Sequence, residues 1–170
     1  RNLLNELANK ISSIGLIHDK LYRSSDLRRV NFHDYLADLV PNIIDSTQGK
    51  ARSLRYDLDI ENIELAVDKV IPLGIIITEL LTNVLKYAYP NNEQGTFSIQ
   101  FSMNAGFYTL RVSDDGVGIP EDIDIDNPQT FGLGVVKALS SQLDAGLRYV
   151  RNEPNSFVFA IPAEKEAVPA

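Results

Sequence analysis

The stretch Glu-Leu-Leu-Thr-Asn-Val-Leu-Lys-Tyr-Ala at residues 79–88 organises the rest of this 170-residue chain. Read as a helix, it places polar residues at i, i+4, i+7 and i+8 on one face, namely Glu79, Asn83, Lys86 and Tyr87. An apolar stripe on another face suits packing against a sheet and consists of Ile77, Leu81, Val84 and Ala88. A carboxamide oxygen can ligate a hard cation, and a lysine can hold a phosphate group as a point charge. The alternative interpretation is a solvated helix face with chance polar residues.

Two glycine clusters follow this stretch. In Asp114-Asp115-Gly116-Val117-Gly118-Ile119-Pro120, an aspartate ends a predicted strand, and two alternate glycines let the backbone turn tightly and approach a ligand. Phe131-Gly132-Leu133-Gly134 precedes an apolar helical run, and glycines at a helix N-terminus expose N–H groups to an anion. The alternative for both clusters is ordinary turns.

In this order, E-x-x-x-N-x-x-K-Y-A, D-x-G-x-G and G-x-G resemble the N, G1 and G2 boxes of the Bergerat ATP-binding fold. Sensor histidine kinases share that fold with Hsp90-like, gyrase-type and MutL-type ATPases. The resemblance covers roughly residues 30–163. It implies the catalytic domain of a two-component histidine kinase, which transfers the γ-phosphoryl group of ATP to a histidine on a dimerisation domain. The alternatives are a non-catalytic nucleotide-binding signalling module and an anti-sigma-type or hydrolytic ATPase of the same superfamily.

The composition is that of a globular protein, with 44% hydrophobic and 23% charged residues. A net charge of −7 argues against a nucleic-acid surface. The absence of cysteine excludes disulfides and thiolate metal sites and is compatible with the reducing cytoplasm, where we expect the domain to lie. We find no signal peptide and expect no membrane insertion. Because the first residue is Arg1, we expect a piece of a longer protein.

The chain opens with a predicted helix whose apolar seam has heptad spacing, formed by Leu4, Leu7, Ile11, Ile14, His18 and Leu21. This seam suits one helix of a bundle. Residues 17–24 and 29–36 resemble the end of the second dimerisation helix in kinases whose phosphoacceptor box reads H-R-x-K-N-x-L-Q. That resemblance implies a homodimeric parent protein and a response regulator as partner. The chain contains no such box.

His18 has two interpretations. Asp19 follows it directly, as an acidic residue follows the phosphoacceptor histidine of kinases, where the carboxylate orients the imidazole. Against this, the heptad seam turns His18 toward the bundle interior, whereas a phosphoacceptor must face solvent. We interpret His18 as structural.

The remaining pattern predicts an α/β two-layer sandwich with a mixed, mostly antiparallel sheet, helices on one face, and a preceding helix from a dimerisation bundle. Asn31 is the expected N-cap of a helix that runs to about Ser46. Alternating segments at 54–60, 97–103 and 108–112 predict strands, and two more strands close the chain. We divide the chain into a dimerisation helix and linker (1–28), an ATP-binding domain (29–165) and a tail (166–170).

The resemblance also implies residue roles. Asp114 accepts the adenine amino proton, Asn83 ligates Mg²⁺, and Lys86 and Tyr87 contact the nucleotide. Gly116 and Gly118 allow close backbone approach, while Gly132, Leu133 and Gly134 bring N–H groups near the phosphates. Glu79 orients the metal or assists phosphoryl transfer. Residues 121–130 correspond to a short ATP lid. The family's last strand opens with Gly-Thr, whose hydroxyl supports the adenine aspartate; here Asn155-Ser156 leaves Ser156 for that role.

Overall fold

The computed structural model describes residues 29–46, 54–90, 94–151 and 154–163, together with Gly15, which is helical. The elements in chain order are β1 (Arg29–Asn31), α2 (Phe32–Ser46), β2 (Leu54–Ile60), β3 (Glu64–Ala66), α3 (Val67–Asn83), the π-helix η1 (Val84–Ala88), β4 (Gly95–Asn104), β5 (Phe107–Asp114), α4 (Phe131–Gln142), β6 (Gly146–Val150) and β7 (Asn155–Pro162). The predicted heptad helix, with His18 and the rest of its seam, lies outside the described residues, as does the tail.

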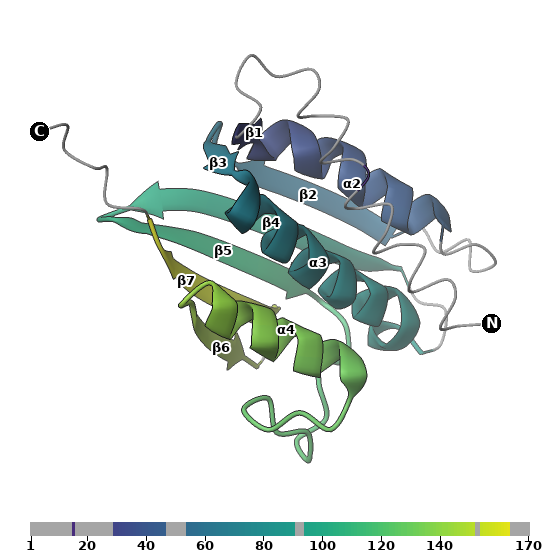
Figure 1. The fold of residues 1–170 in the computed structure, drawn as a ribbon. Helices are drawn as coiled ribbons and strands as arrows, with labels where there is room; N and C mark the ends of the chain where they lie inside the picture. The colour runs from purple at the N-terminus through teal and green to yellow at the C-terminus, as the bar shows by residue number, and fades with distance from the viewer. Residues whose placement is uncertain (1–14, 16–28, 47–53, 91–93, 152–153, 164–170) are drawn as a thin grey trace, which may run out of the picture.

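Five strands form one mixed sheet in the order β2-β4-β5-β7-β6. Strand β2 runs parallel to β4, and the other neighbours pair antiparallel. Strands β1 and β3 form a separate two-stranded antiparallel sheet. Helices α2, α3 and α4 lie side by side over one face of the large sheet (Figure 1). The predicted fold class, a two-layer sandwich with helices on one face, is confirmed.

Local sequence signals account for several boundaries. The Asn31 side-chain oxygen accepts the backbone N–H of Asp34 at 3.1 Å, so Asn31 is the N-cap of α2, as predicted. The turn between β4 and β5 places Ala105 at φ 50° and Gly106 at φ 82°, the left-handed geometry that matches the twist of a hairpin. This hairpin delivers Asp114 to the end of β5.

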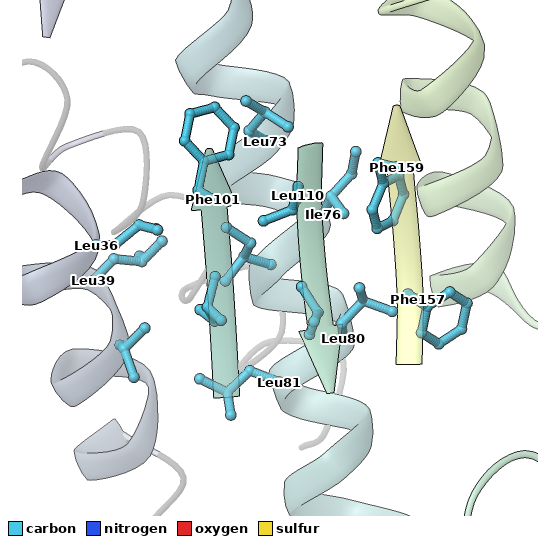
Figure 2. Close-up of a cluster of buried hydrophobic side chains, with 14 of the residues drawn as sticks. Leu36, Leu39, Leu73, Ile76, Leu80, Leu81, Phe101, Leu110, Phe157 and Phe159 are labelled. Carbon is cyan, nitrogen blue, oxygen red and sulfur yellow. The ribbon is translucent and has the colours of Figure 1, made fainter. Parts of the chain in front are cut away.

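The core lies between the sheet and the three helices (Figure 2). Its buried side chains come from both layers, and those labelled in the figure are Leu36, Leu39, Leu73, Ile76, Leu80, Leu81, Phe101, Leu110, Phe157 and Phe159. Burying each large apolar side chain stabilises the fold by about 1.5–3 kcal/mol. Helix α3 is covered by the sheet and flanked by α2 and α4, which explains why it is apolar on most sides.

The stretch Val67–Ala88 is long and apolar enough, by length and composition, to cross a membrane, which the sequence analysis did not anticipate. In this fold 72% of its most apolar window is buried inside the protein, as in a core helix. Pro72 lies in the second turn of α3, since the helix begins at Val67. The proline ring therefore leaves the Asp68 carbonyl without its usual helical donor.

Candidate nucleotide-binding site

A pocket of about 470 Å³ opens along the C-terminal end of α3 and along η1. Its other walls come from the end of β5, the loop after it, the first turn of α4, and one residue each of β6 and β7. Eight of the residues singled out from the sequence line it, namely Glu79, Asn83, Lys86, Tyr87, Asp114, Gly118, Gly132 and Leu133. Gly116, Gly134 and Ser156 do not. The three sequence motifs therefore converge on one cavity.

The helical wall ends in a π-helix, which the sequence analysis did not predict. From Val84 to Ala88 the backbone widens, so that residues after Asn83 depart from the 3.6-residue spacing assumed above. Lys86 and Tyr87 still reach the pocket, Lys86 half-buried and Tyr87 with 67% of its surface exposed at the mouth. Glu79 is only 8% exposed. Along this wall, exposure to solvent thus increases from the buried carboxylate of Glu79 to the exposed ring of Tyr87.

Asp114 presents a half-buried carboxylate to the pocket. Burial raises the pKa of this carboxyl above its usual range, and the neighbouring charge of Asp115 adds to that rise. Two hydrogen bonds oppose the rise, one from the Gly116 N–H at 3.0 Å and one from the side chain of Asn155. The carboxylate is therefore held in one orientation by the loop and by strand β7.

The support of Asp114 differs from the expectation. Ser156 points its hydroxyl at the Ser113 hydroxyl, 2.9 Å away, and donates to the Pro154 carbonyl at 3.1 Å. Ser156 therefore does not support Asp114, and this part of the prediction is wrong. Residue 155 lies directly opposite residue 114 in the β5–β7 register, whereas Ser156 lies opposite Ser113. Because neighbouring strand residues face opposite sides of the sheet, the supporting side chain is Asn155.

Asn155 also braces the glycine loop. Its Nδ2 donates to the Gly116 carbonyl at 2.8 Å. Gly118 adopts φ 73°, and a Cβ there would lie 2.6 Å from the Asn155 Oδ1, so this position needs glycine for both conformation and space. Gly116 contributes differently from the expectation: a Cβ there would lie 2.5 Å from the Ala88 carbonyl oxygen. Gly116 lets the loop pack on the end of η1 and does not line the pocket.

A second network joins the end of η1 to the loop and to β4. The buried Tyr89 hydroxyl donates to the Asp115 Oδ1 at 2.6 Å, and the same oxygen accepts the Thr96 N–H at 2.7 Å. Burial alone would raise the pKa of Asp115, but these hydrogen bonds outweigh it and the pKa lies below its usual range. A Cβ on Gly95 would lie 1.9 Å from the Tyr89 ring, which explains the glycine at the start of β4.

The second glycine cluster opens α4 against the buried carboxylate. A Cβ on Gly132 would lie 2.9 Å from Glu79 Oε2 and 3.9 Å from the Asn83 side chain, so glycine lets the helix start approach α3 without displacing the Glu79 carboxylate. The N–H groups of Gly132 and Leu133, in the first turn, have no partner within the helix. The Gly134 N–H was expected near the phosphates. In the structure it donates instead to the Thr130 carbonyl at 3.0 Å and is not available to a phosphate.

Glu79 and Asn83 present side-chain oxygens of the kind that a magnesium ion takes as ligands. Both line the pocket, and both lie within 4 Å of a common point above Gly132. A carboxylate and a carboxamide oxygen are hard ligands, and Mg²⁺ characteristically takes few protein ligands and completes its shell with phosphate oxygens and water. The described residues contain no group of three or more acidic, histidine or cysteine side chains, so a shell completed by phosphate is the arrangement that fits.

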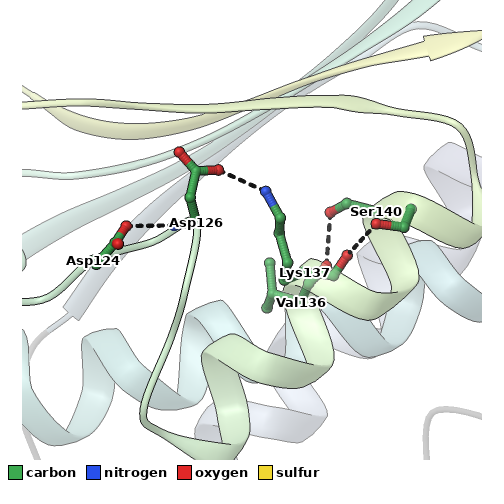
Figure 3. A network of polar contacts seen from close by, with 6 residues as sticks. Asp124, Asp126, Val136, Lys137 and Ser140 are labelled. Atoms are coloured by element: carbon green, nitrogen blue, oxygen red, sulfur yellow. Dashed lines mark hydrogen bonds and ion pairs between the residues drawn. The ribbon is translucent and has the colours of Figure 1, made fainter.

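The segment between the clusters leaves the sheet at the end of β5 and leads into α4. Its first residues are held by the hydroxyl of Tyr149 and the guanidinium of Arg151. Nearer α4, Lys137 Nζ lies 2.6 Å from Asp126 Oδ1, and the Asp126 N–H donates to Asp124 Oδ1 (Figure 3). Ile119, Ile123, Thr130 and Phe131 line the pocket from this side. Of the segment predicted as a lid, Ile123 and Thr130 therefore line the cavity, and its role as a lid stays a prediction.

Sequence reasoning missed four residues that shape the site, namely Tyr89, Asp115, Tyr149 and Asn155. The sequence did point to Asp115, since this residue directly follows Asp114 in the first glycine cluster. Tyr149 lies in one of the two strands that close the chain, and nothing in that pattern points to a site. Asn155 occupies the place where the sequence departs from the family's Gly-Thr pair. Its role became visible only through the register of β5 and β7.

The fold and the pocket define the chain as a two-layer α/β sandwich with a cavity where the ends of its helices and strands meet. Two family models match the sequence: "Histidine kinase" over residues 1–47 and "Histidine kinase-, DNA gyrase B-, and HSP90-like ATPase" over residues 68–165. The chain belongs to this ATPase family and carries the ATP-binding domain of a histidine kinase. The family resemblance inferred from the N, G1 and G2 boxes is confirmed.

Individual relatives of the chain are also histidine kinases. The chain is 30% identical to the sensor histidine kinase PdtaS of Mycobacterium tuberculosis over 166 residues, which cover 95% of this chain and 33% of that protein. It is 27% identical to blue-light-activated histidine kinase 2 of Erythrobacter litoralis over 120 residues, 70% of this chain and 34% of that protein. The chain thus spans about a third of the length of the curated relatives it matches.

Among solved structures, the histidine kinase domain of the Erythrobacter litoralis EL346 blue-light-activated kinase superposes with a TM-score of 0.80. The sequence identity is 23%, and the match covers 92% of this chain and 74% of that domain. At this identity the likeness establishes the fold.

Proposed function

We propose that this domain binds Mg²⁺–ATP and transfers the γ-phosphoryl group to a histidine on a dimerisation domain, within a two-component signalling protein. The observation that carries the proposal is the convergence of all three motifs on one pocket, with Glu79 and Asn83 against the start of α4 and Asp114 at the end of β5. The partly buried carboxylate of Asp114 can select a base by accepting a hydrogen bond from it. The side-chain oxygens of Glu79 and Asn83, beside the N–H groups at the start of α4, suit a polyphosphate that carries a metal ion.

Asp114 is assigned to the adenine amino group. Its carboxylate is half-buried and already oriented by Gly116 and Asn155, so binding costs little reorganisation. An acceptor at this point favours an exocyclic amino donor and leaves the carbonyl of guanine facing a negative charge. The apolar side chains around it, among them Val112, Ile119 and Phe157, suit the faces of a base.

The phosphates are assigned to the other end of the wall. Lys86 supplies a positive charge, and the N–H groups of Gly132 and Leu133 supply donors at a helix N-terminus. Asn83 holds Mg²⁺, which when bound offsets the charge of the phosphate oxygens. Tyr87, exposed at the mouth, contacts the nucleotide beside Lys86.

In the transfer, the bond between the γ-phosphorus and the ADP oxygen breaks as a phosphorus–nitrogen bond to the acceptor imidazole forms. Catalysis of such a step is mostly positioning and electrostatic stabilisation. Glu79 is placed to orient the metal and to accept the proton that leaves the imidazole, because its carboxylate is buried beside Asn83 and Gly132. A homodimeric parent, a response regulator as the next phosphoryl acceptor, and a cytoplasmic location belong to the same proposal.

Calorimetric titration with a non-hydrolysable ATP analogue, with and without Mg²⁺, tests the binding half. We expect binding that Mg²⁺ strengthens, and in Asn83→Asp an altered metal dependence with the fold intact, since a second carboxylate changes the charge around the metal. Asn104→Asp, an exposed change at the end of β4, is the matched control.

The transfer half is tested in a longer chain that includes a phosphoacceptor histidine. Acid-labile label from γ-labelled ATP is expected there, and its loss in Glu79→Gln with unchanged ATP affinity would assign Glu79 to the chemical step. Absence of analogue binding to this chain at millimolar concentration would refute the proposed function.

A further inference from the structure

The edge strand β6 and the residue after it hold the backbone at the point where the lid begins. The Tyr149 hydroxyl oxygen accepts the Ile119 N–H at 3.0 Å. The Arg151 guanidinium donates to the Ile119 carbonyl and, at 3.3 Å, to the Pro120 carbonyl. The backbone N–H and the carbonyl of Ile119 are therefore both held by side chains that lie about 30 positions further along the chain.

The two holding side chains also fix each other. The Arg151 guanidinium carbon lies 5.4 Å from the centre of the Tyr149 ring, within the range of a cation–π contact. The Tyr149 ring packs on Phe157 of β7, with ring centres 4.8 Å apart. Burial raises the pKa of the Tyr149 hydroxyl, so this group stays protonated at neutral pH. Tyr149 is thereby anchored to the sheet and does not follow the loop.

The anchored residue belongs to the pocket wall. Ile119, Tyr149 and Phe157 all line the cavity, and they lie at the Asp114 end. Asp114 lines the same cavity as Tyr149, and its charge adds to the rise in the pKa of the Tyr149 hydroxyl. Strand β6 therefore contributes to the part of the site assigned to the base.

The other end of the segment is held differently. An ion pair between this segment and α4 joins Lys137 to Asp126, whose side chain is 86% exposed (Figure 3). Exposed ion pairs contribute little and are screened by salt. The segment is therefore held more firmly at the Ile119 backbone than at the Asp126 side chain.

We propose that Tyr149 and Arg151 are positioning residues for the nucleotide base: they hold Ile119 as a fixed wall of the adenine end, so that movement of the lid begins after Pro120. This inference rests on the proposed function, because the bound ligand it concerns is ATP. It predicts that removing the Tyr149 hydroxyl alone weakens nucleotide binding, although that hydroxyl lies on an edge strand remote from the N, G1 and G2 motifs in sequence.

The experiment compares the full 170-residue chain with Tyr149→Phe and Arg151→Gln. The first variant keeps the ring and its packing and removes only the hydroxyl. In the absence of nucleotide, amide hydrogen exchange measured by NMR should speed up at Ile119 in both variants. It should not change at Val117, whose N–H donates to the Ala88 carbonyl at 2.9 Å. The matched controls are Tyr56→Phe on the opposite edge strand and Arg148→Gln on β6 itself, neither of which lines the pocket.

Calorimetry then measures ATP and AMP affinity. We expect Kd to rise about tenfold in Tyr149→Phe, equal to about 1.4 kcal/mol, by the same factor for ATP and AMP because the anchor lies at the base end. An irreversibly unfolded fraction would lower the number of binding sites and leave Kd unchanged, and a reversibly unfolded fraction large enough to raise Kd tenfold would be visible in urea unfolding. Faster exchange at Ile119 with an unchanged Kd would overturn the inference while leaving the proposed function intact. Failure of the unaltered chain to bind ATP would overturn both.

Discussion

At the scale of single residues, the neighbouring pair Asp114 and Asp115 shows how one strand end serves two purposes. Successive strand residues face opposite sides, so Asp114 faces the pocket and Asp115 faces β4 and Tyr89. Burial raises the pKa of Asp114, whereas hydrogen bonds hold the pKa of the exposed Asp115 below its usual range. The first carboxyl is prepared for a ligand, and the second stabilises the loop that presents it.

The first prediction concerns Asp114→Asn. An amide presents a donor or a neutral acceptor to the adenine amino group, so ATP binding should weaken by roughly 1.5–3 kcal/mol, the range for a hydrogen bond to a charged group. Because the pKa of Asp114 is raised, the affinity of the unaltered protein should fall as pH falls through that raised pKa. Binding needs the ionised form, and protonation removes it.

Titration calorimetry at several pH values compares the ATP affinity of the unaltered protein with that of Asp114→Asn. Ionisation of the ATP phosphates affects both proteins equally, so it cancels in the difference between the two affinities. Asp122→Asn, an exposed lid position, controls for the change in charge. Equal ATP affinity of Asp114→Asn and the unaltered protein would show that the base lies elsewhere.

The second prediction separates the two glycines of the G-x-G cluster. At Gly134 an added Cβ would meet no atom within 4 Å, so Gly134→Ala should raise the free energy of unfolding by about 0.4–1 kcal/mol. In Gly132→Ala the new methyl group displaces the Glu79 carboxylate. That change should reduce Mg²⁺-dependent ATP binding while altering stability little, since a side-chain end gives way more easily than backbone.

Urea unfolding measures the stability of both glycine variants, and calorimetry with Mg²⁺–ATP measures their binding. Reduced binding in Gly134→Ala with normal binding in Gly132→Ala would reverse the assignment of the two positions.

At the scale of elements, the junction of α3, η1 and β4 determines where the site residues lie. The π-helix ends at Ala88, whose carbonyl accepts the Val117 N–H at 2.9 Å. Directly after it, Tyr89 ties the chain to Asp115 and to the Thr96 carbonyl. The element that carries Lys86 and Tyr87 is thus joined to the loop after Asp114 at two successive residues.

The third prediction tests this junction with Tyr89→Phe. Loss of the hydroxyl removes one donor from Asp115 and should destabilise the protein by roughly 1–1.5 kcal/mol at neutral pH, a modest value because Asp115 is exposed. The lowered pKa of Asp115 stabilises the fold above the unfolded pKa of an aspartate, about 3.9, and this contribution is lost as pH falls through the folded pKa. The difference between the two proteins should therefore narrow in acid.

Denaturant unfolding at neutral and acidic pH measures this difference, with Tyr56→Phe as the exposed control. A destabilisation that is the same at every pH would indicate lost packing and not a lost hydrogen bond to a carboxylate.

At the scale of the whole molecule, the helical layer and the sheet have separate tasks. The sheet supplies Asp114 and Asn155 from adjacent strands, and the helices supply Glu79, Asn83 and Gly132 from α3 and α4. The pocket lies where the ends of these elements meet. The histidine among the described residues is His33, an exposed residue of α2 beside Asp34. It does not line the pocket.

The fourth prediction follows from this division. Incubated with Mg²⁺ and γ-labelled ATP, the chain should bind nucleotide yet acquire no acid-labile label, because neither of its two histidines lies in a phosphoacceptor box. The measurement is label retained after gel filtration, with acid treatment as the control. Label that disappears in His18→Ala would show that His18 is a phosphoacceptor and not a structural residue.

The sequence by itself determined the class of fold and most of the pocket. The alternation of apolar residues specified the strands, and the order of three motifs specified that Glu79, Asn83, Asp114 and Gly132 belong to one site. These features depend on spacing along the chain, which periodicity and glycine chemistry reveal. The division at residues 28 and 165 stays a prediction.

Only the tertiary structure decided which side chains support that site. The register of β5 against β7 puts Asn155 and not Ser156 beside Asp114. The π-helix resets the spacing before Lys86. Tyr149 and Arg151 reach Ile119 across about 30 residues. Each of these depends on a contact between distant segments, and the free energy of such contacts comes from strand pairing and core packing, which no local pattern in the sequence records.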